Sequence, residues 1–515
     1  MDITRKTERQ ALAKSLDSAE NKQRKALSLK QSEIYSDRLF QYVKEELLRH
    51  FDRNTVNEMP IVSFVNFPRR IVQQEASIYR DDPKRSFSDL NDDQQLLMEQ
   101  LYQDCQINSK LKMANQKYKL QDQTHILVYP ENGKLSVKVL YQHQIDAIPD
   151  INNPEVAEAY VISSFDKQKY LSYEFAQSAT GESGISTIGD SLGDSAKTPL
   201  ASKEDYKKAS TFFTYWSKTH NFVFNGHGDV VDPETREPIM NPTEEDMVSP
   251  IPGIMPIIDV SQNKDFEYFV RSGLAVTDFG VQYNAAMSDT WHIARLQGYS
   301  VAVLKGPDGV MPENLKMGPN LILNLKTDPN NGINAGDIDF QFASPSPDIP
   351  ATLQLLETML MNFVSSRGLD PKEIAQNGTR SFSSALERML AMIDEFEASR
   401  DDFKVFMDVE KQLYEIIKQW IINAQDQLED YQIAIPEESY LSVKFEQPEM
   451  LQTGEEKVAY WNKRIENGTA TRVDAIMDID GLTKEQAEEK VMEIDSERFI
   501  QEDNEGRGQS DVQPS

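Results

Sequence analysis

The sequence predicts an α+β protein, and three observations lead to that class. Segments 124–129 and 135–141 are rich in β-branched and aromatic residues and flank an Asn-Gly turn, the pattern of a β-hairpin. Helix signals occupy the chain on either side of this strand-rich region. The strongest of them runs from Phe382 to Leu428 without Gly or Pro, with apolar residues at alternating three- and four-residue spacing. Unbroken, that helix would measure about 70 Å at about 1.5 Å per residue, which suggests an assembly of long helices packed side by side.

Composition narrows the class of protein. The chain has 515 residues and a net charge of −30, from 84 acidic and 54 basic side chains. Nucleic-acid binding usually depends on Lys and Arg that neutralise phosphates, and this balance opposes it. Both a well-solvated surface and a surface that stays near DNA without adhering to it fit the charge. The single cysteine, Cys105, excludes an intrachain disulfide framework and a zinc site built on several cysteines.

The N-terminal half is expected to pass from helices to strands. Residues 1–120 predict polar helices, with an amphipathic stripe over 39–48 and a further helix over 90–111. Strands are expected after this region, at the hairpin and at 157–164, 170–175 and 211–224. The stretch 178–203, rich in Ser, Gly, Thr and Asp, predicts a flexible insertion.

The C-terminal half is expected to return to helices. The elements predicted before the long helix are a helix at 264–286, short strands at 300–304 and 321–325, a helix at 353–363 and a breaker-rich loop at 367–379. After it we expect a strand at 440–445, a charged helical tail, and disorder over 501–515. No apolar run approaches the roughly eighteen residues that cross a bilayer, and the N-terminus lacks the apolar region of a signal peptide. We therefore expect assembly in a cytoplasm.

Sites for chemistry are scarce in the sequence. Neither a phosphate-binding P-loop nor a dinucleotide-binding glycine pattern occurs. His220, His227, Asp229 and Asp232 have spacings that a metal site could use, but a glycine-containing turn with solvent-facing histidines is the simpler interpretation. The acidic run 478–481 does not fit a calcium loop, whose twelfth position would need a Glu. The sequence therefore predicts no enzyme activity, no metal and no cofactor.

Several segments beyond residue 120 occur in an informative order. They are Ile254-Met-Pro-Ile-Ile258, the helical stretch Asp265 to Ser288, Gly378-Thr-Arg-Ser-Phe-Ser-Ser-Ala-Leu386, and Leu441-Ser-Val-Lys-Phe445 followed by Lys457 to Asp480. In this order and spacing, over roughly 120–498, the chain resembles the portal proteins of tailed bacteriophages.

The resemblance implies a particular division of the chain. It implies an N-terminal helical segment of the wing at 1–120, a β-rich wing at 121–262, a stem helix at 263–294, a small α/β clip at 295–346, a returning stem helix at 347–366, a tunnel loop at 367–381, a long wing helix at 382–430, a wing strand at 431–450, a helical crown at 451–500 and a disordered tail at 501–515.

The resemblance also implies a function and partners. Portal proteins form rings, usually of about twelve subunits, at one capsid vertex of the virion, where they serve as the channel for DNA packaging and ejection. Expected partners are other copies of the chain, the terminase large subunit, major capsid and scaffold proteins, head–tail connector or adaptor proteins and double-stranded DNA, but no membrane. Assembly would take place in the host cytoplasm. On this interpretation the apolar stripe of 382–428 would be buried between neighbouring subunits, and Trp420→Asp would impair assembly.

Two groups of residues follow as candidate sites. Those expected to face DNA from the tunnel loop are Lys372, Asn377, Gly378 and Arg380, and those expected to meet terminase or a connector at the clip are Lys305, Lys316 and Lys326. Solvent exposure on an ordinary helix–helix connection is the alternative for each of them. The alternative for the whole chain is a non-ring helical scaffold or adaptor, and a hydrolase using His220 to Asp232 is a third hypothesis.

Overall fold

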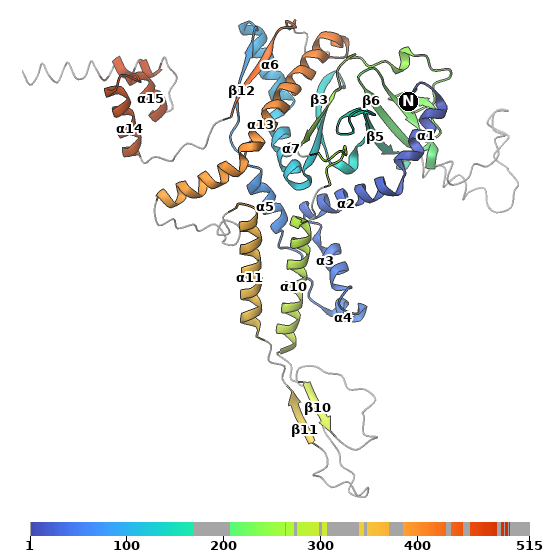
Figure 1. Ribbon diagram of the computed structural model, residues 1–515, viewed down its shortest axis with the longest axis vertical. Helices are drawn as coiled ribbons and strands as arrows, with labels where there is room; N and C mark the ends of the chain where they lie inside the picture. The colour runs from blue at the N-terminus through green and yellow to red at the C-terminus, as the bar shows by residue number, and fades with distance from the viewer. Residues whose placement is uncertain are drawn as a thin grey trace, which may run out of the picture. The chain divides into compact units, whose positions relative to one another are not determined.

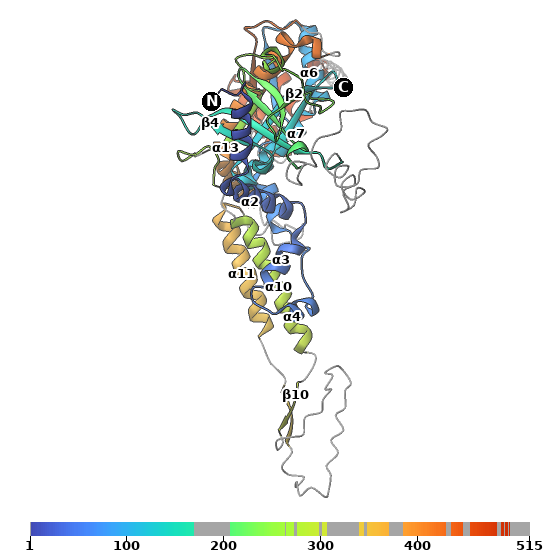
Figure 2. The ribbon, with the colours of Figure 1, turned by 90° about the vertical axis from the view of Figure 1, so that its right-hand side faces the viewer.

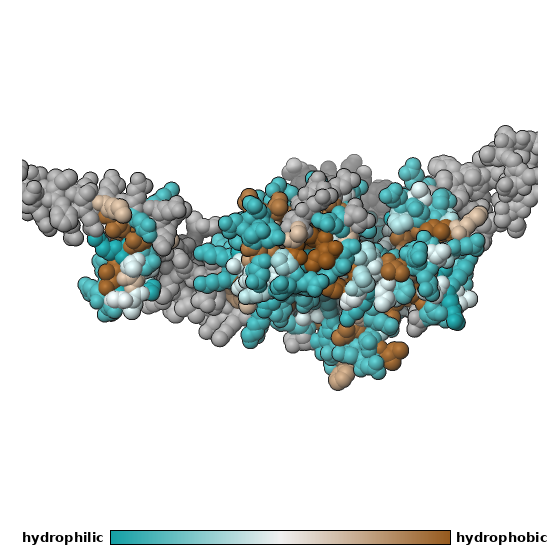
Figure 3. All heavy atoms as spheres, turned by 90° about the horizontal axis from the view of Figure 1, so that it is seen from above, coloured by the Kyte–Doolittle hydropathy of each residue, from teal (hydrophilic) through white to brown (hydrophobic). Residues whose placement is uncertain are grey.

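The computed structural model describes residues 2–168, 207–262, 264–271, 275–297, 301–305, 339–343, 348–369, 385–428, 434–445, 454–480 and parts of 486–494. The chain divides into two compact units, Met1–Ser381 with Asp394–Glu446, and Phe382–Ile393 with Gln447–Ser515. Each unit is described by itself (Figure 1). Figure 3 shows hydrophilic residues over much of one face of the molecule, with hydrophobic groups between them, as a strongly acidic and solvated surface would have.

Helices begin the first unit. They are α1 (Lys6–Leu16), α2 (Ala19–Tyr35), α3 (Leu39–Leu47), α4 (Arg53–Glu58), α5 (Phe67–Glu75), α6 (Asp92–Asp104) and α7 (Ile107–Gln121). Local capping sets several of their starts, since Ser18 caps α2, Asp52 caps α4, and Asn91 forms a capping box with Gln94 at α6. The single helix predicted at 90–111 is wrong. Gln106 has a left-handed φ of 53°, which separates α6 from α7.

Two antiparallel sheets follow. The three-stranded sheet has the order β3 (Lys134–Leu140), β2 (Gln123–Glu131), β9 (Ile257–Ser261), and the five-stranded sheet runs from β4 (Asp146–Pro149) through β5 (Ala157–Phe165), β6 (Thr211–Ser217) and β7 (Asn221–Asn225) to β8 (Val230–Val231). The predicted hairpin is confirmed, with Asn132 and Gly133 both at positive φ. The strand predicted at 211–224 is instead the pair β6–β7. The strand predicted at 170–175 and the insertion 178–203 lie outside the described residues.

A two-stranded sheet joins distant parts of the chain. In it, β1 (Lys84–Ser88) pairs antiparallel with β12 (Tyr440–Lys444). The sequence analysis predicted β12 and missed β1, whose composition, Lys-Arg-Ser-Phe-Ser, gives little strand signal.

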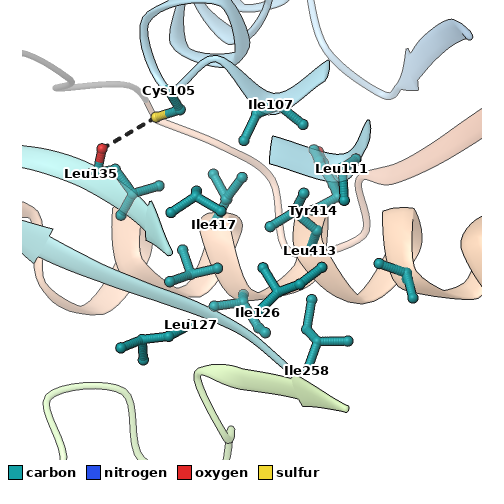
Figure 4. Close-up of a cluster of buried hydrophobic side chains, with 14 of the residues drawn as sticks. Cys105, Ile107, Leu111, Ile126, Leu127, Leu135, Ile258, Leu413, Tyr414 and Ile417 are labelled. Carbon is teal, nitrogen blue, oxygen red and sulfur yellow. Dashed lines mark hydrogen bonds between the residues drawn. The ribbon is translucent and has the colours of Figure 1, made fainter. Parts of the chain in front are cut away.

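The main core lies between the three-stranded sheet, α6, α7 and the long helix α13 (Ala385–Asn423). Figure 4 shows Ile126 of β2 beside Leu413 of α13, and Leu127 and Ile417 belong to the same cluster. Trp420 is buried, and its indole N–H donates to the Val128 carbonyl at 3.0 Å. The expectation that this stripe is buried between subunits is therefore wrong for the stretch near Trp420, because the same chain already covers it. The side chains of 385–400 lie outside the description.

Two further helices and a hairpin complete the first unit. They are α10 (Ala275–Gln297), the strand pair β10 (Val301–Lys305) and β11 (Asp339–Ala343), and α11 (Ile349–Ser366). The helix predicted at 264–286 starts too early, since 264–271 is irregular and α10 continues to 297. The strand predicted at 321–325 is outside the described residues, and β11 was not predicted.

The second unit contributes α14 (Gly454–Glu466) and α15 (Arg472–Asp480), which contact each other. Gly468, at φ 67°, follows α14 in the left-handed region, and Thr471 and Asp474 exchange hydrogen bonds at the start of α15. The predicted disorder of 501–515 lies outside the described residues. Among the residues that were described, no helix is long and apolar enough to span a membrane.

Candidate assembly site

The helix pair α10–α11 corresponds to the two segments, 263–294 and 347–366, that the sequence analysis expected to be stem helices. The rings of Phe279 and Phe363 stack at 4.2 Å with an interplanar angle of 4°. On α11, Leu356, Leu360 and Val364 are buried at four-residue spacing, and the last two share a cluster with Val276 of α10. The pair therefore packs through one narrow stripe of α11.

The outward side of α11 is exposed and uncharged. Its residues recur at alternating three- and four-residue spacing and form what we call the outer face: Thr352, Leu355, Met359, Asn362 and Ser366. Leu355 is 59% exposed and Met359 is 47% exposed. In the 18 residues of α11 the only charged side chain is Glu357. Heptad-like spacing, exposed apolar residues and a lack of charge are typical of a helix face that packs against another protein surface.

The opposite side of α10 is covered. Val281 and Ala285 belong to a cluster with Leu39, Val43 and Leu47 of α3. Segment 59–67, whose last residue is the first of α5, runs beside α10, where the Val62 N–H donates to the Ser288 hydroxyl at 2.8 Å. The side-chain amide of Asn284 donates to the Val65 carbonyl, also at 2.8 Å. Side chains of α10 therefore hold segment 59–67 in place.

Segment 264–271 connects β9 to α10 and is held by buried side chains. Gln123 of β2 accepts from the Val270 N–H at 3.0 Å and donates to the Tyr268 carbonyl at 3.2 Å. The Tyr268 hydroxyl lies 2.9 Å from His125 Nε2 and 2.8 Å from the Tyr160 hydroxyl. These tertiary contacts override the helical spacing of the segment, which explains the wrong helix prediction.

Burial controls the protonation of this network. Complete burial, which Asp259 opposes only in part, lowers the pKa of His125 to about 4. Burial also raises the pKa of Tyr268 well above its usual value. Both side chains are therefore neutral at pH 7, and the contact between them is a neutral hydrogen bond.

Two ion pairs link helices to distant parts of the first unit, one between α13 and β1 and the other between the end of α11 and α5. Glu410 on α13 is fully buried and binds Arg85 of β1 through two hydrogen bonds of 2.9 and 2.6 Å. At the end of α11, Arg367 binds both carboxylate oxygens of Glu75, at 2.7 and 2.9 Å. The C-terminal end of α11 is therefore anchored to α5.

The predicted site residues are mostly outside the described part of the chain. Those in this position are Lys372, Asn377, Gly378, Arg380, Lys316 and Lys326. Lys305 is the last residue of β10, opposite Asp339 in the register, and its side chain is not described. Both groups of residues therefore remain predictions.

The histidine and aspartate cluster is explained locally. Asp229 pairs with Lys6 at 2.5 Å, and Asp232 accepts the backbone N–H groups of Glu234 and Thr235 in its own turn. Within the described ranges, no group of three or more His, Cys, Asp or Glu side chains is arranged to hold a metal ion.

The sequence analysis missed the outer face of α11 and the Glu410–Arg85 pair. A signal for the first was present, because 349–366 is a strongly apolar helix with one charge in a chain that is 27% charged. The pair carries no such signal, since its partners are separated by 325 residues.

No family model matches the sequence, and no curated protein matches it either. Among solved structures, a chain from the virion of a native gene transfer agent particle is similar at 10% identity and a TM-score of 0.36, covering 81% of this chain and 89% of that chain. A chain from the neck of an empty particle of this kind is similar at 11% identity and a TM-score of 0.35, with the same coverage. Scores at this level carry no argument about function, so the proposal below depends on the residues of this protein.

Proposed function

We propose that the chain is a portal protein that forms a ring at one vertex of a phage-like capsid. In this role the ring is the channel for DNA packaging and ejection and the docking platform for terminase and connector proteins. The chain acts as a structural component and not as an enzyme. The observation that carries the proposal is the packed α10–α11 pair, whose helices flank the antiparallel strands β10 and β11 in the sequence and leave the uncharged outer face of α11 exposed.

Charge supports self-association through that face. Each copy carries −30, so a ring of about twelve copies would carry roughly −360 before counterions. Copies of such a chain repel one another wherever acidic surfaces meet. An uncharged helix face is the surface on which they can approach without that penalty. The same acidic balance keeps phosphates from adhering, which a channel for sliding DNA requires.

The adaptor alternative loses its main support. That alternative is built around a helical hairpin and a coiled coil, and a coiled coil would need the apolar stripe of 382–428 to be open to a partner. In the structure, the stripe from Phe406 to Trp420 is covered by the sheet and helices of the same chain. A hydrolase at His220 to Asp232 would predict metal-dependent activity that His227→Ala abolishes.

The first test is the assembly state. We expect mass photometry of the purified full chain to give a species of about twelve subunits, and negative-stain images of that species to show rings with a central hole. A chain that stays monomeric over a wide range of concentration would contradict the proposal. A stable dimer that persists as concentration rises would favour the adaptor.

A second test separates the ring from the channel. Deleting 368–380, which contains Lys372, Asn377 and Arg380, should leave rings intact and abolish DNA packaging in a packaging assay with terminase and empty capsids. A packaging-competent deletion would show that this loop does not act on DNA. Failure to form rings would instead make the loop part of the assembly contact.

A further inference from the structure

We propose that the outer face of α11 in one protomer packs against segment 59–67 of the next protomer. The inference rests on the proposed ring and goes beyond it by naming both sides of the subunit contact. It defines a head-to-tail contact between two different surfaces of the same chain.

The two surfaces lie on opposite sides of α10. At about 100° per residue, Val281 and Ala285, which face α3, are about 160° around the helix from Phe279 and Tyr283, which face α11. Figures 1 and 2, taken from perpendicular directions, both show α10 between α11 and α3. Within segment 59–67, Val62 and Val65 contact Ser288 and Asn284 of α10 on the α3 side, whereas Phe67, the first residue of α5, packs edge-on against Tyr283. One protomer therefore cannot bring its own outer face against its own segment 59–67.

Segment 59–67 has the properties of a receiving surface. It reads Met-Pro-Ile-Val-Ser-Phe-Val-Asn-Phe and contains no charged residue. Met59 and Val62 are buried against the protein, whereas Phe64 is 75% exposed. The Val62 N–H, which donates to Ser288, and the Val65 carbonyl, which accepts from Asn284, fix the segment before any partner arrives, so little conformational entropy remains to be lost on binding. A large aromatic side chain on a fixed, apolar segment is a typical binding anchor.

The neighbouring helix α3 is a poorer candidate for the receiving surface. Its exposed side carries Gln41 and Glu45, which are hydrogen-bonded to each other, and Lys44 lies beside them. Packing the uncharged outer face onto these groups would remove their hydration without offering a partner. Segment 59–67 carries no such cost.

Charge identifies the occupant as a second copy of the chain. Helix α11 and segment 59–67 together comprise 27 residues and contain one charged residue. At the average charged content of the chain, 27%, about seven would be expected. A nucleic acid would need basic residues on the contact, and neither surface has any. For two copies that each carry −30, contact through uncharged surfaces is the favourable arrangement.

Opposite placement of the two surfaces determines how association proceeds. After one contact forms, each pair of protomers still has one free outer face and one free segment 59–67. A contact of this kind adds protomers until the ring closes, whereas a symmetric contact would stop at a dimer. The inferred contact is thus the kind that a ring requires.

Cysteine cross-linking tests the contact directly, because the only native cysteine, Cys105, is buried. The double variant Met359→Cys, Phe64→Cys of the full chain should yield a ladder of cross-linked species up to the ring size under mild oxidation. A mixture of the two single variants should yield cross-linked dimers only. The matched control replaces Phe64→Cys with Ile151→Cys, a residue that is 89% exposed and distant from the segment in sequence, and should give no ladder.

The outcomes separate the inference from the proposed function. Rings in negative stain without a cross-link between positions 64 and 359 would overturn the inferred contact and leave the portal proposal standing. Cross-linked dimers from Met359→Cys alone would show a symmetric contact and also overturn it. Absence of rings and of higher oligomers in the unmodified chain would overturn the portal proposal itself.

A charge variant provides the second readout. Phe64→Glu places a carboxylate on the receiving surface and should abolish rings in mass photometry while leaving the circular dichroism spectrum and thermal midpoint of the protomer unchanged. Ile151→Glu, the matched control, should assemble as the unmodified chain does. Normal rings from Phe64→Glu would contradict the inference.

Discussion

Removing Glu410 tests how α13 is fixed to the rest of the first unit. Its carboxylate is fully buried, and Arg85 binds both of its oxygens, at 2.9 and 2.6 Å. The Tyr79 hydroxyl adds a third hydrogen bond, at 3.1 Å. Glu410→Ala would leave the Arg85 guanidinium, whose side chain is only 11% exposed, without its partner charge. Breaking a buried pair in this way costs about 3–5 kcal/mol.

The matched control is a surface pair on the same helix. Asp408 and Lys411 lie 3.9 Å apart and are both more than half exposed, so Asp408→Ala should cost less than about 1 kcal/mol. Replacing both partners, as Arg85→Met with Glu410→Met, should cost less than Glu410→Ala alone, because no unpaired charge remains buried. The coupling energy of the cycle should then be at least about 2 kcal/mol.

Native-state hydrogen exchange of α13 measures this locally. A loss of about 4 kcal/mol corresponds to roughly a thousandfold faster exchange of the amides that open with the helix. We expect that acceleration for Glu410→Ala and little change for Asp408→Ala. Equal exchange in the two variants, or a double variant that costs the sum of its single changes, would refute the argument that this pair fixes the helix.

Three further predictions follow from the packing. Gly280→Ala should lower the thermal midpoint and weaken the α5–α10 contact by about 1–3 kcal/mol, since the new Cβ would lie 2.3 Å from Pro68 Cγ; an unchanged midpoint would contradict this packing. Trp420→Phe should destabilise the protomer by about 1–3 kcal/mol in urea unfolding, because the Val128 carbonyl loses its hydrogen bond, and ring size should be unaffected; a variant that is as stable but does not assemble would place Trp420 in a subunit contact. The free energy of unfolding should fall by up to about 3 kcal/mol as pH drops from 6.5 towards 4, because in that range His125 is protonated only in the unfolded state. His125→Gln should remove that part of the pH dependence, and an identical pH profile in the variant would refute this prediction.

Local signals explain which elements could be predicted from the sequence. The hairpin at Asn132-Gly133 is specified by two residues that accept positive φ, and α11 by its apolar spacing and the Asp348 cap. The start of α10 could not be predicted, because residues 264–271 are held by Gln123 and other distant side chains. An amphipathic pattern indicates that one side of a helix packs against another surface, but it does not identify that surface.

The same distinction applies to the candidate site. The stripe around Trp420 finds its partner in the same chain, whereas the outer face of α11 finds none among the described residues. Both look alike as patterns in the sequence. The proposed DNA-facing and clip lysines remain predictions, since their roles depend on segments beyond the described residues. What distinguishes an internal contact from an external one is tertiary structure, and the only hint in the sequence is the near absence of charge in 349–366.

The pairing of β1 with β12 has a consequence for the protein during its synthesis. Strand β1 ends at Ser88, and its partner ends at Lys444. At about 5–20 residues per second, a ribosome needs roughly 20–70 s to make the intervening chain. For most of that interval the main core lacks both β12 and the buried part of α13, so a nascent chain exposes apolar surface that only residues 406–444 later cover. The outer face of α11 is made before the body that carries it is complete. Unfinished chains of this protein are therefore prone to associate before they have folded. Binding by a chaperone until β12 emerges would prevent that association.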